Sequence, residues 1–143
     1  MAGGYRYLEH SSDIYAEAWG ESLEEAFENA AKALFDAMTD IKLVEAKVEV
    51  EVEAEGLDEQ ELLYSWLENL LVKYEVESLV FSKFKVQPIR QDGELLKLKG
   101  LASGEPLNLE KHPSKVEVKA VTYHMMEVKR EDKRFLIRVL FDI

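Results

Sequence analysis

Two segments of the chain carry apolar residues at helical spacing, whereas most other apolar residues alternate with polar ones as in strands. A capping box, formed by Ser22 and the glutamate three residues later, predicts a helix that continues to Met38. Asp58 is expected to cap a second helix, whose wide apolar stripe covers Leu62–Leu71. The chain must therefore bury two amphipathic helices against a largely β structure.

The predicted strands are short, and most of them follow the second helix. From Lys47 to Glu55, valines alternate with charges, which predicts a strand with one wet face that ends at Gly56. Asp92-Gly93 is typical of a hairpin turn. Two helices against about seven strands predict an α+β fold, with the helices packed on one or two mostly antiparallel sheets. The remaining strands are expected around Tyr5–Tyr7 and Ile14–Ala18 and at Leu79–Val86, Glu94–Ala102, Lys115–Tyr123, Met125–Lys129 and Arg134–Phe141, with a loop over Gly104–Pro113.

Composition limits the classes of function. At 143 residues, 47% of them hydrophobic, the chain is expected to form one domain over residues 1–143. A net charge of -11 argues against broad binding to nucleic-acid phosphates and favours cations or basic protein surfaces as partners. The absence of cysteine excludes disulfides and thiolate metal sites. No signal segment or membrane-length apolar run is present, so a cytoplasmic monomer is expected.

The last ten residues alternate as a strand up to the final residue of the sequence. The alternation places five apolar residues on one face, so core packing should hold this end of the chain still. Asp142 then lies one residue from the α-carboxylate of Ile143. Two carboxylates so close are suited to a hard cation, although an acidic residue at this position is also explained by solvation alone. The five apolar residues are Phe135, Ile137, Val139, Phe141 and Ile143.

Asp13 is a third candidate oxygen ligand. It closes a polar cluster and leads into an apolar alternation that should fix its backbone, but an aspartate here can also simply cap a turn. Asp13, Asp142 and the Ile143 carboxylate together would suit Ca²⁺ or Mg²⁺. The set has too little histidine and no cysteine to favour structural zinc.

The other polar candidates each have an ordinary structural alternative. His10 or His124 could act as an acid or base beside an aspartate, or be satisfied or exposed histidines. His112 is expected in a surface loop. Lys119 follows the alternation of a strand and is explained by solvation, unless it lies near the carboxylates. Ser11 and Ser12 lack the glycine-flanked elbow of a serine hydrolase.

Together, several motifs in chain order resemble the archease family over nearly the whole chain. One motif departs from the family, because the usual His-Thr-Ala-Asp reads His-Ser-Ser-Asp at residues 10–13. Both replacements are small, and serine keeps the hydroxyl of threonine. The motifs are Tyr5–Asp13, Leu23–Phe27, Met38–Asp40, Lys111–Pro113, Glu117–His124 and Phe141–Ile143.

The resemblance implies an accessory protein that activates the RtcB-type RNA ligase of tRNA splicing. That ligase joins RNA ends through a histidine-linked GMP intermediate at a manganese site, and archease-like proteins promote its guanylylation and repeated turnover. The resemblance also implies a metal site at Asp13, Asp142 and Ile143, holding Ca²⁺ first and Mg²⁺ or Mn²⁺ as alternatives. It implies a functional lysine, for which Lys119 is the first candidate and Lys111 the second, and it adds His10 as a further contact residue.

Two other functions remain open from the residues. One is a metal-dependent phosphoester hydrolase, in which His10 or His124 acts as a base toward a metal-bound water. The other is a chaperone-like binding module whose acidic surface contacts several nucleic-acid enzymes.

Overall fold

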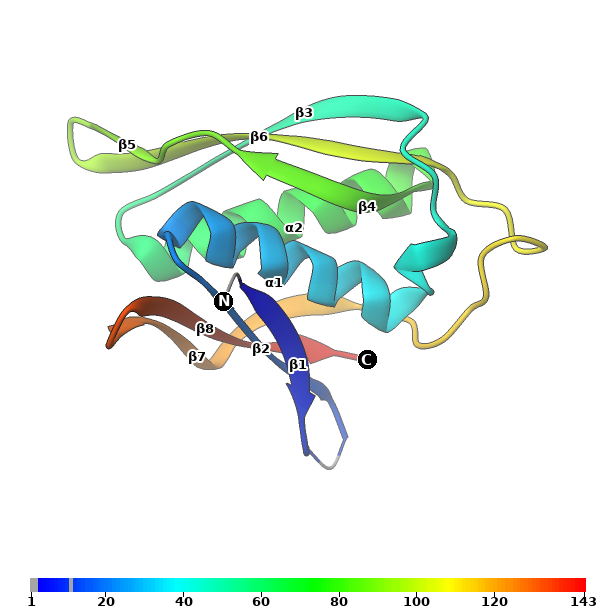
Figure 1. Cartoon of the computed structure of the whole chain (residues 1–143), viewed down its shortest axis with the longest axis horizontal. Coiled ribbons are helices and arrows are strands. Elements are labelled where there is room, and N and C mark those ends of the chain that lie inside the picture. Colours follow the sequence, from blue (N-terminus) through cyan, green and yellow to red (C-terminus); the bar gives the residue numbers. More distant parts are fainter. Residues whose placement is uncertain (1–2, 11) are drawn as a thin grey trace.

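The computed structural model describes residues 3–10 and 12–143, and in it two helices lie between two β-sheets (Figure 1). All strand pairs are antiparallel. The prediction of an α+β fold is therefore confirmed, with eight strands in the described residues. The first sheet has the order β1 (Gly4–Leu8), β2 (Ile14–Gly20), β8 (Arg134–Asp142) and β7 (Ala120–Glu131). The second has the order β3 (Val48–Gly56), β6 (Leu95–Pro106) and β4 (Leu79–Val86), with β5 (Arg90–Asp92) paired to β6.

The helices begin where the capping residues predict. α1 (Leu23–Met38) follows Ser22, whose Oγ accepts a 3.0 Å hydrogen bond from the amide of Glu25. α2 (Glu59–Glu77) follows Asp58, whose Oδ1 accepts a 2.8 Å hydrogen bond from an amide in the first turn. Each cap satisfies an amide that would otherwise lack a partner. A short 3₁₀ turn, η1 (Ile41–Leu43), follows α1.

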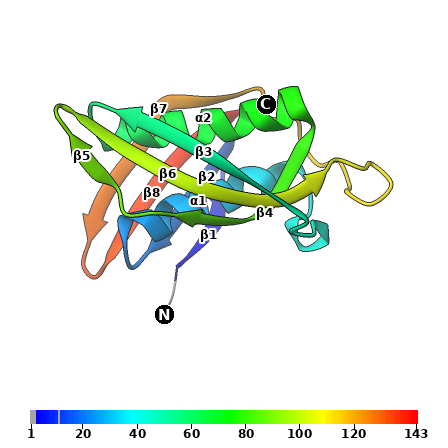
Figure 2. The ribbon, with the colours of Figure 1, turned by 90° about the horizontal axis from the view of Figure 1, so that it is seen from above.

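One hydrophobic core fills the space between the sheets, and Figure 2 shows both helices lying beneath the second sheet. Trp66 of α2 is fully buried, and its indole Nε1 donates a 3.1 Å hydrogen bond to the carbonyl of Phe27 in α1. Gly100 of β6 lies so close that a Cβ there would be 2.7 Å from the Trp66 ring. The large indole therefore requires a glycine on the facing strand.

The strand predicted from Lys115 is wrong in its first part. β7 begins only at Ala120, and residues 113–119 belong to no strand. The amides of Lys115 and Val116 instead donate to carbonyls at the end of α1, at 3.0 and 3.3 Å. Lys115 and Lys119 are exposed while Val118 is buried, so the alternation predicts the burial correctly. Alternation alone cannot distinguish a paired strand from an extended segment on a helix end.

The separate strand predicted at Met125–Lys129 is also wrong. β7 is one strand with a wide bulge, because Thr122 pairs with Leu140 and Glu127 pairs with Arg138. Residues 123–126 therefore lie opposite Val139 alone. Met125 has a φ of 59°, which is rare for a residue other than glycine.

The predicted Gly104–Pro113 loop needs two corrections. β6 continues to Pro106, and His112, expected at the surface, is fully buried. Burial is possible because both ring nitrogens have partners: Nδ1 accepts from the amide of Asn108 at 3.0 Å, and Nε2 lies 2.9 Å from Oε2 of Glu105.

The C-terminal strand is held by core packing as predicted, except at its last residue. Ile137, Val139 and Phe141 are fully buried, whereas Ile143 is 37% exposed because β8 ends at Asp142. Leu140, on the other face of β8, is buried as well. In the described residues, neither helix is both long and apolar enough to span a membrane.

Candidate metal and partner-contact site

The strand register brings Asp13 and Asp142 to the same end of the first sheet. Ile14 of β2 pairs with Phe141 of β8. Asp13 immediately precedes Ile14, and Asp142 immediately follows Phe141, so the two aspartates meet where this strand pair ends. Figure 1 marks the C-terminus at the same end. Two residues that lie 129 positions apart in the sequence thus lie at the same end of neighbouring strands.

Lys119 reaches this end from the residue that precedes β7. Ala120 pairs with Asp142, and the amide of Lys119 donates a 2.7 Å hydrogen bond to the carbonyl oxygen of Asp142. The Lys119 side chain is exposed. We call Asp13, Lys119, Asp142 and Ile143 the carboxylate end. Asp142 is the last residue of β8, Asp13 and Lys119 each immediately precede a strand, and Ile143 follows β8, so the paired strands position all four residues.

His10 lies beside Asp13 in the turn between β1 and β2. Its Nδ1 is 3.7 Å from Oδ2 of Asp13, and the ring contacts Tyr15 edge to face at 6.0 Å. Ser11, between them, is outside the described residues. Both residues, with Glu9 and Tyr7, line a shallow depression of about 530 Å³. The depression gives solvent access to one side of the carboxylate end.

Lys111 is placed elsewhere, in an ion network at the end of β6. Its Nζ lies 2.9 Å from Oε2 of Glu105 and also contacts Glu45. Glu105 is only 4% exposed, and it accepts a 2.8 Å hydrogen bond from the amide of Glu45. This amide, followed by the Lys111 ammonium, lowers the pKa of Glu105 to about 2. Lys111 therefore helps to compensate a buried carboxylate and is not one of the strand-end groups.

The donor chemistry of the carboxylate end suits a hard divalent cation. Asp13, Asp142 and the Ile143 carboxylate supply only oxygen atoms, as Ca²⁺ and Mg²⁺ prefer. Among the described residues, no three His, Cys, Asp or Glu side chains form a metal-binding group.

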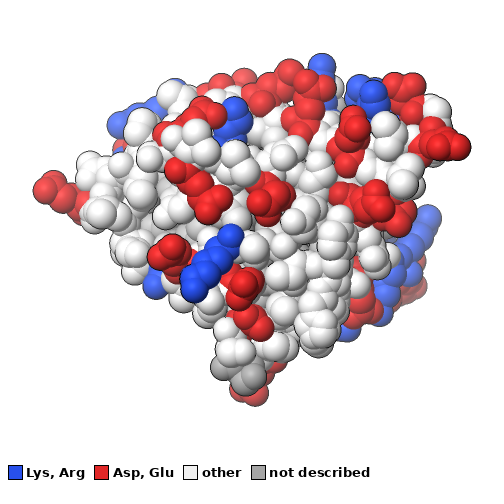
Figure 3. All heavy atoms as spheres, turned by 180° about the vertical axis from the view of Figure 1, so that it is seen from behind, with Lys and Arg blue, Asp and Glu red and all other residues white. Residues whose placement is uncertain are grey.

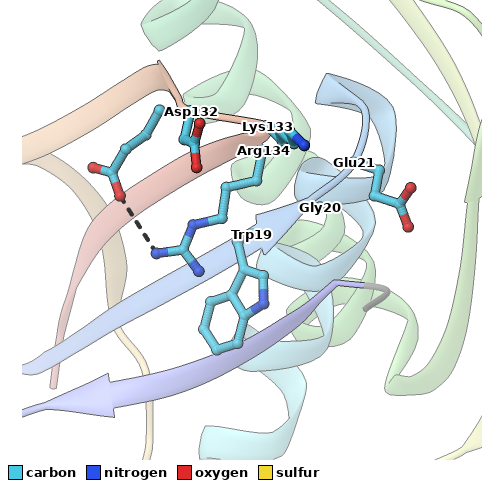
Figure 4. Close-up of a pocket in the computed structure, with 7 residues that line it drawn as sticks. Trp19, Gly20, Glu21, Asp132, Lys133 and Arg134 are labelled. Atoms are coloured by element: carbon cyan, nitrogen blue, oxygen red, sulfur yellow. Dashed lines mark hydrogen bonds and ion pairs between the residues drawn. The ribbon is translucent and has the colours of Figure 1, made fainter.

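A second depression, of about 410 Å³, lies at the opposite end of β8 (Figure 4). The guanidinium of Arg134 lies over the ring of Trp19, 5.5 Å from its centre. Glu131 also lines this depression and forms an ion pair with Arg134 at 3.4 Å. None of the predicted site residues lines it.

Sequence reasoning missed the partners of Lys111 and the surroundings of Tyr123. Glu105 gives no signal in the sequence, because its partners Glu45, Lys111 and His112 are brought together only by the fold. Tyr123 stacks on Tyr64 of α2 with ring centres 4.5 Å apart. The two tyrosines are far apart in the sequence, so only the fold could bring them together.

The surface on the α2 side is mainly acidic. Figure 3 shows this face, on which carboxylates are spread widely, with few basic side chains and uncharged surface between them. β3 contributes a row of exposed glutamates at alternate positions, from Glu49 to Glu55. This distribution agrees with the formal charge of -11 and disfavours contact with phosphates.

Comparison with known proteins gives one consistent match. Residues 5–143 match the model of the Archease protein family. The archease of Sulfolobus acidocaldarius is 47% identical over 139 residues, which cover 97% of this chain and 98% of that protein. The archease of Pyrococcus furiosus is 45% identical over 140 residues, with the same coverage.

Two solved structures share the fold. The solution structure of protein 1598 from Methanobacterium thermoautotrophicum is 45% identical and covers 98% of this chain and 99% of that one, with a TM-score of 0.86. The crystal structure of a Thermotoga maritima archease, described as a possible chaperone, is 21% identical with a TM-score of 0.59. It covers 96% of both chains, and at this identity it supports the fold alone.

Proposed function

This chain belongs to the archease family, and we propose that it is an accessory protein that activates an RtcB-type RNA ligase of tRNA splicing. In this role it promotes guanylylation and repeated turnover of the ligase and carries out no reaction of its own. The supporting observation is the strand register, which brings Asp13 and Asp142 to one end of the first sheet. Lys119 joins them through its hydrogen bond to Asp142.

The carboxylate end is the proposed working surface. Asp13, Asp142 and the Ile143 carboxylate would hold a divalent ion, Ca²⁺ in the first place and Mg²⁺ or Mn²⁺ as alternatives. A bound ion would supply positive charge that offsets the repulsion among the three carboxylates. Lys119, exposed beside them, adds a flexible ammonium that can contact the ligase. His10 would orient Asp13 within the turn.

The charge of the chain is consistent with a protein partner. With 29 acidic and 18 basic residues, the surface attracts a basic protein face and repels RNA phosphates. An activator with this charge can approach an RNA ligase without competing for the RNA. The proposal includes a monomer that acts in the cytoplasm.

The test is a ligation assay with an RtcB-type ligase, GTP and a cleaved RNA, in which the RNA is in large excess over the ligase. With the wild-type chain, product should exceed one equivalent per ligase, and without it the reaction should stop near one. Equal product in both reactions would contradict the proposal. Hydrolysis of phosphoesters by the chain without ligase would favour the hydrolase. Stimulation of several unrelated nucleic-acid enzymes, without preference for the ligase, would favour the chaperone-like module.

A further inference from the structure

The bulge in β7 presents an aromatic side chain that the core does not require. Tyr123 is 49% exposed and Met125 is 46% exposed, and both belong to β7, the edge strand of the first sheet. We call Tyr64, Tyr123 and Met125 the bulge surface. Exposed tyrosine and methionine are enriched at protein interfaces relative to the remaining surface. A local irregularity of the strand presents both side chains, and bulges commonly redirect side chains beside functional sites.

The bulge is held in place from both sides. The hydroxyl of Tyr15, on β2, donates a 2.8 Å hydrogen bond to the carbonyl of Met125. The side-chain amide nitrogen of Gln60, on α2, donates a 3.4 Å hydrogen bond to the backbone carbonyl of Met126. The Met126 side chain is buried in the core. These contacts fix a backbone that includes the positive φ of Met125, so the exposed side chains are preorganised.

One face of the Tyr123 ring is covered, and the residue as a whole stays 49% exposed. Tyr64 stacks against it, with the ring planes 11° apart and the centres 4.5 Å apart. Arginines cover the rings of Trp19 and Phe135, but among the described residues no such cation lies over Tyr123. The second ring face is thus available for a planar or cationic group.

Charge decides which group fits. Burial raises the pKa of Tyr123, and the nearby carboxylates of Glu61 and Asp58 raise it further. These acids at the start of α2, together with the negative face of the ring, favour a cation. A nucleic-acid base could also stack, but the phosphates that accompany it would be repelled by a chain of charge -11. A second copy of this chain would bring the same acidic surface and be repelled as well.

The bulge surface is close to the carboxylate end. Tyr15, which braces the bulge, contacts His10 and lines the same depression as Asp13. Thr122, where the bulge begins, pairs with Leu140, two residues before Asp142. One partner bound at the carboxylate end could therefore also reach Tyr123.

We propose that the open face of Tyr123 binds an arginine or lysine side chain of the partner protein, with Tyr64 and Met125 forming the rest of the contact. This inference rests on the proposed function, because it takes the ligase as the protein that supplies the cation. It adds a second point of attachment, which orients the chain on its partner while the carboxylate end is engaged.

The test measures the affinity of the full chain for the ligase by calorimetry. Tyr123→Leu removes the ring and should weaken binding by about fivefold, the size of an exposed cation–π contact. Tyr123→Phe, the matched control, keeps the ring face and should bind as the wild type does. Thermal unfolding verifies that both variants are folded.

A second series separates a cation from an apolar group. Progressive fluorination of a phenylalanine at position 123 weakens the negative ring face without removing apolar area. Affinity should fall steadily with fluorination, and constant affinity would overturn the inference. Equal affinity of Tyr123→Leu and the wild type for the ligase would also overturn the inference, but it would leave the proposed function standing. If the wild type does not bind the ligase, both proposals fail. A loss caused by Tyr123→Leu in binding single-stranded RNA, or in self-association, would also overturn the inference.

Discussion

The amide of Lys119 donates a 2.7 Å hydrogen bond to the carbonyl oxygen of Asp142. The backbone of each residue is thus used to fix the other, whereas their side chains are both exposed. A substitution that keeps the backbone can therefore remove either side chain with little effect on the fold. This separation of structure from side-chain chemistry makes the carboxylate end suitable for mutational tests.

Lys119→Ala should reduce ligase stimulation by about tenfold, as expected for loss of a charged contact with a partner. The free energy of unfolding should change by less than about 0.5 kcal/mol, because the side chain is exposed. Lys83→Ala is the matched control, since it removes an exposed lysine from the second sheet. Stimulation and chemical denaturation are measured for both variants. Equal stimulation by both would remove Lys119 from the site.

Metal binding should depend on Asp13 and Asp142. For the wild type, Ca²⁺ at about a hundred times its dissociation constant should raise the free energy of unfolding by about 2.7 kcal/mol. Asp13→Asn and Asp142→Asn should each abolish most of this rise, whereas Glu9→Gln, which removes a charge from the same depression, should keep it. Extension of the chain beyond Ile143 should also reduce it. Denaturation with and without Ca²⁺ measures the effect, and an equal rise in all variants would exclude this site.

His112→Ala should destabilise the chain by about 2 kcal/mol, because it empties a fully buried position and removes the acceptor of the Asn108 amide. His124→Ala, which changes an exposed histidine on the bulge, should have little effect. Chemical denaturation at neutral pH compares the two. Similar stabilities would show that the buried ring does not hold the loop.

Glu105 should make stability depend on acid pH. Its pKa is lowered from 4.5 to about 2, chiefly by the amide of Glu45 and then by Lys111. A depressed pKa stabilises the folded state above the ordinary value, and this stabilisation is lost as the pH falls from about 4.5 toward 2. Glu105→Gln should therefore show a smaller loss of stability between pH 6 and pH 3 than the wild type does. An equal loss of stability in the variant and the wild type would contradict the lowered pKa of Glu105.

Local signals predicted the helices and most strands well. Ser22 and Asp58 identify the helix starts because a capping side chain acts within three residues of its own position. The predictions fail where the partner is distant. His112 is buried because Glu105 and Asn108 satisfy it, and a Lys-His-Pro sequence does not reveal this geometry.

The candidate site could be predicted only in part, because its residues are also far apart in the sequence. The sequence indicates that Asp13 and Asp142 each adjoin a strand, but not that β2 and β8 are neighbours in one sheet. The resemblance to a family connects them, and the register supplies the physical reason. The bulge that exposes Tyr123 could not be predicted, since alternation continues on both sides of it.

The most direct test of the central claim is the rate of guanylylation of an RtcB-type ligase, measured with labelled GTP over repeated turnovers. The wild-type chain and Glu9→Gln should both sustain guanylylation after the first round. A chain with both Asp13→Asn and Asp142→Asn, verified as folded, should fail to sustain it. Sustained guanylylation with this double variant at the wild-type rate would contradict the account.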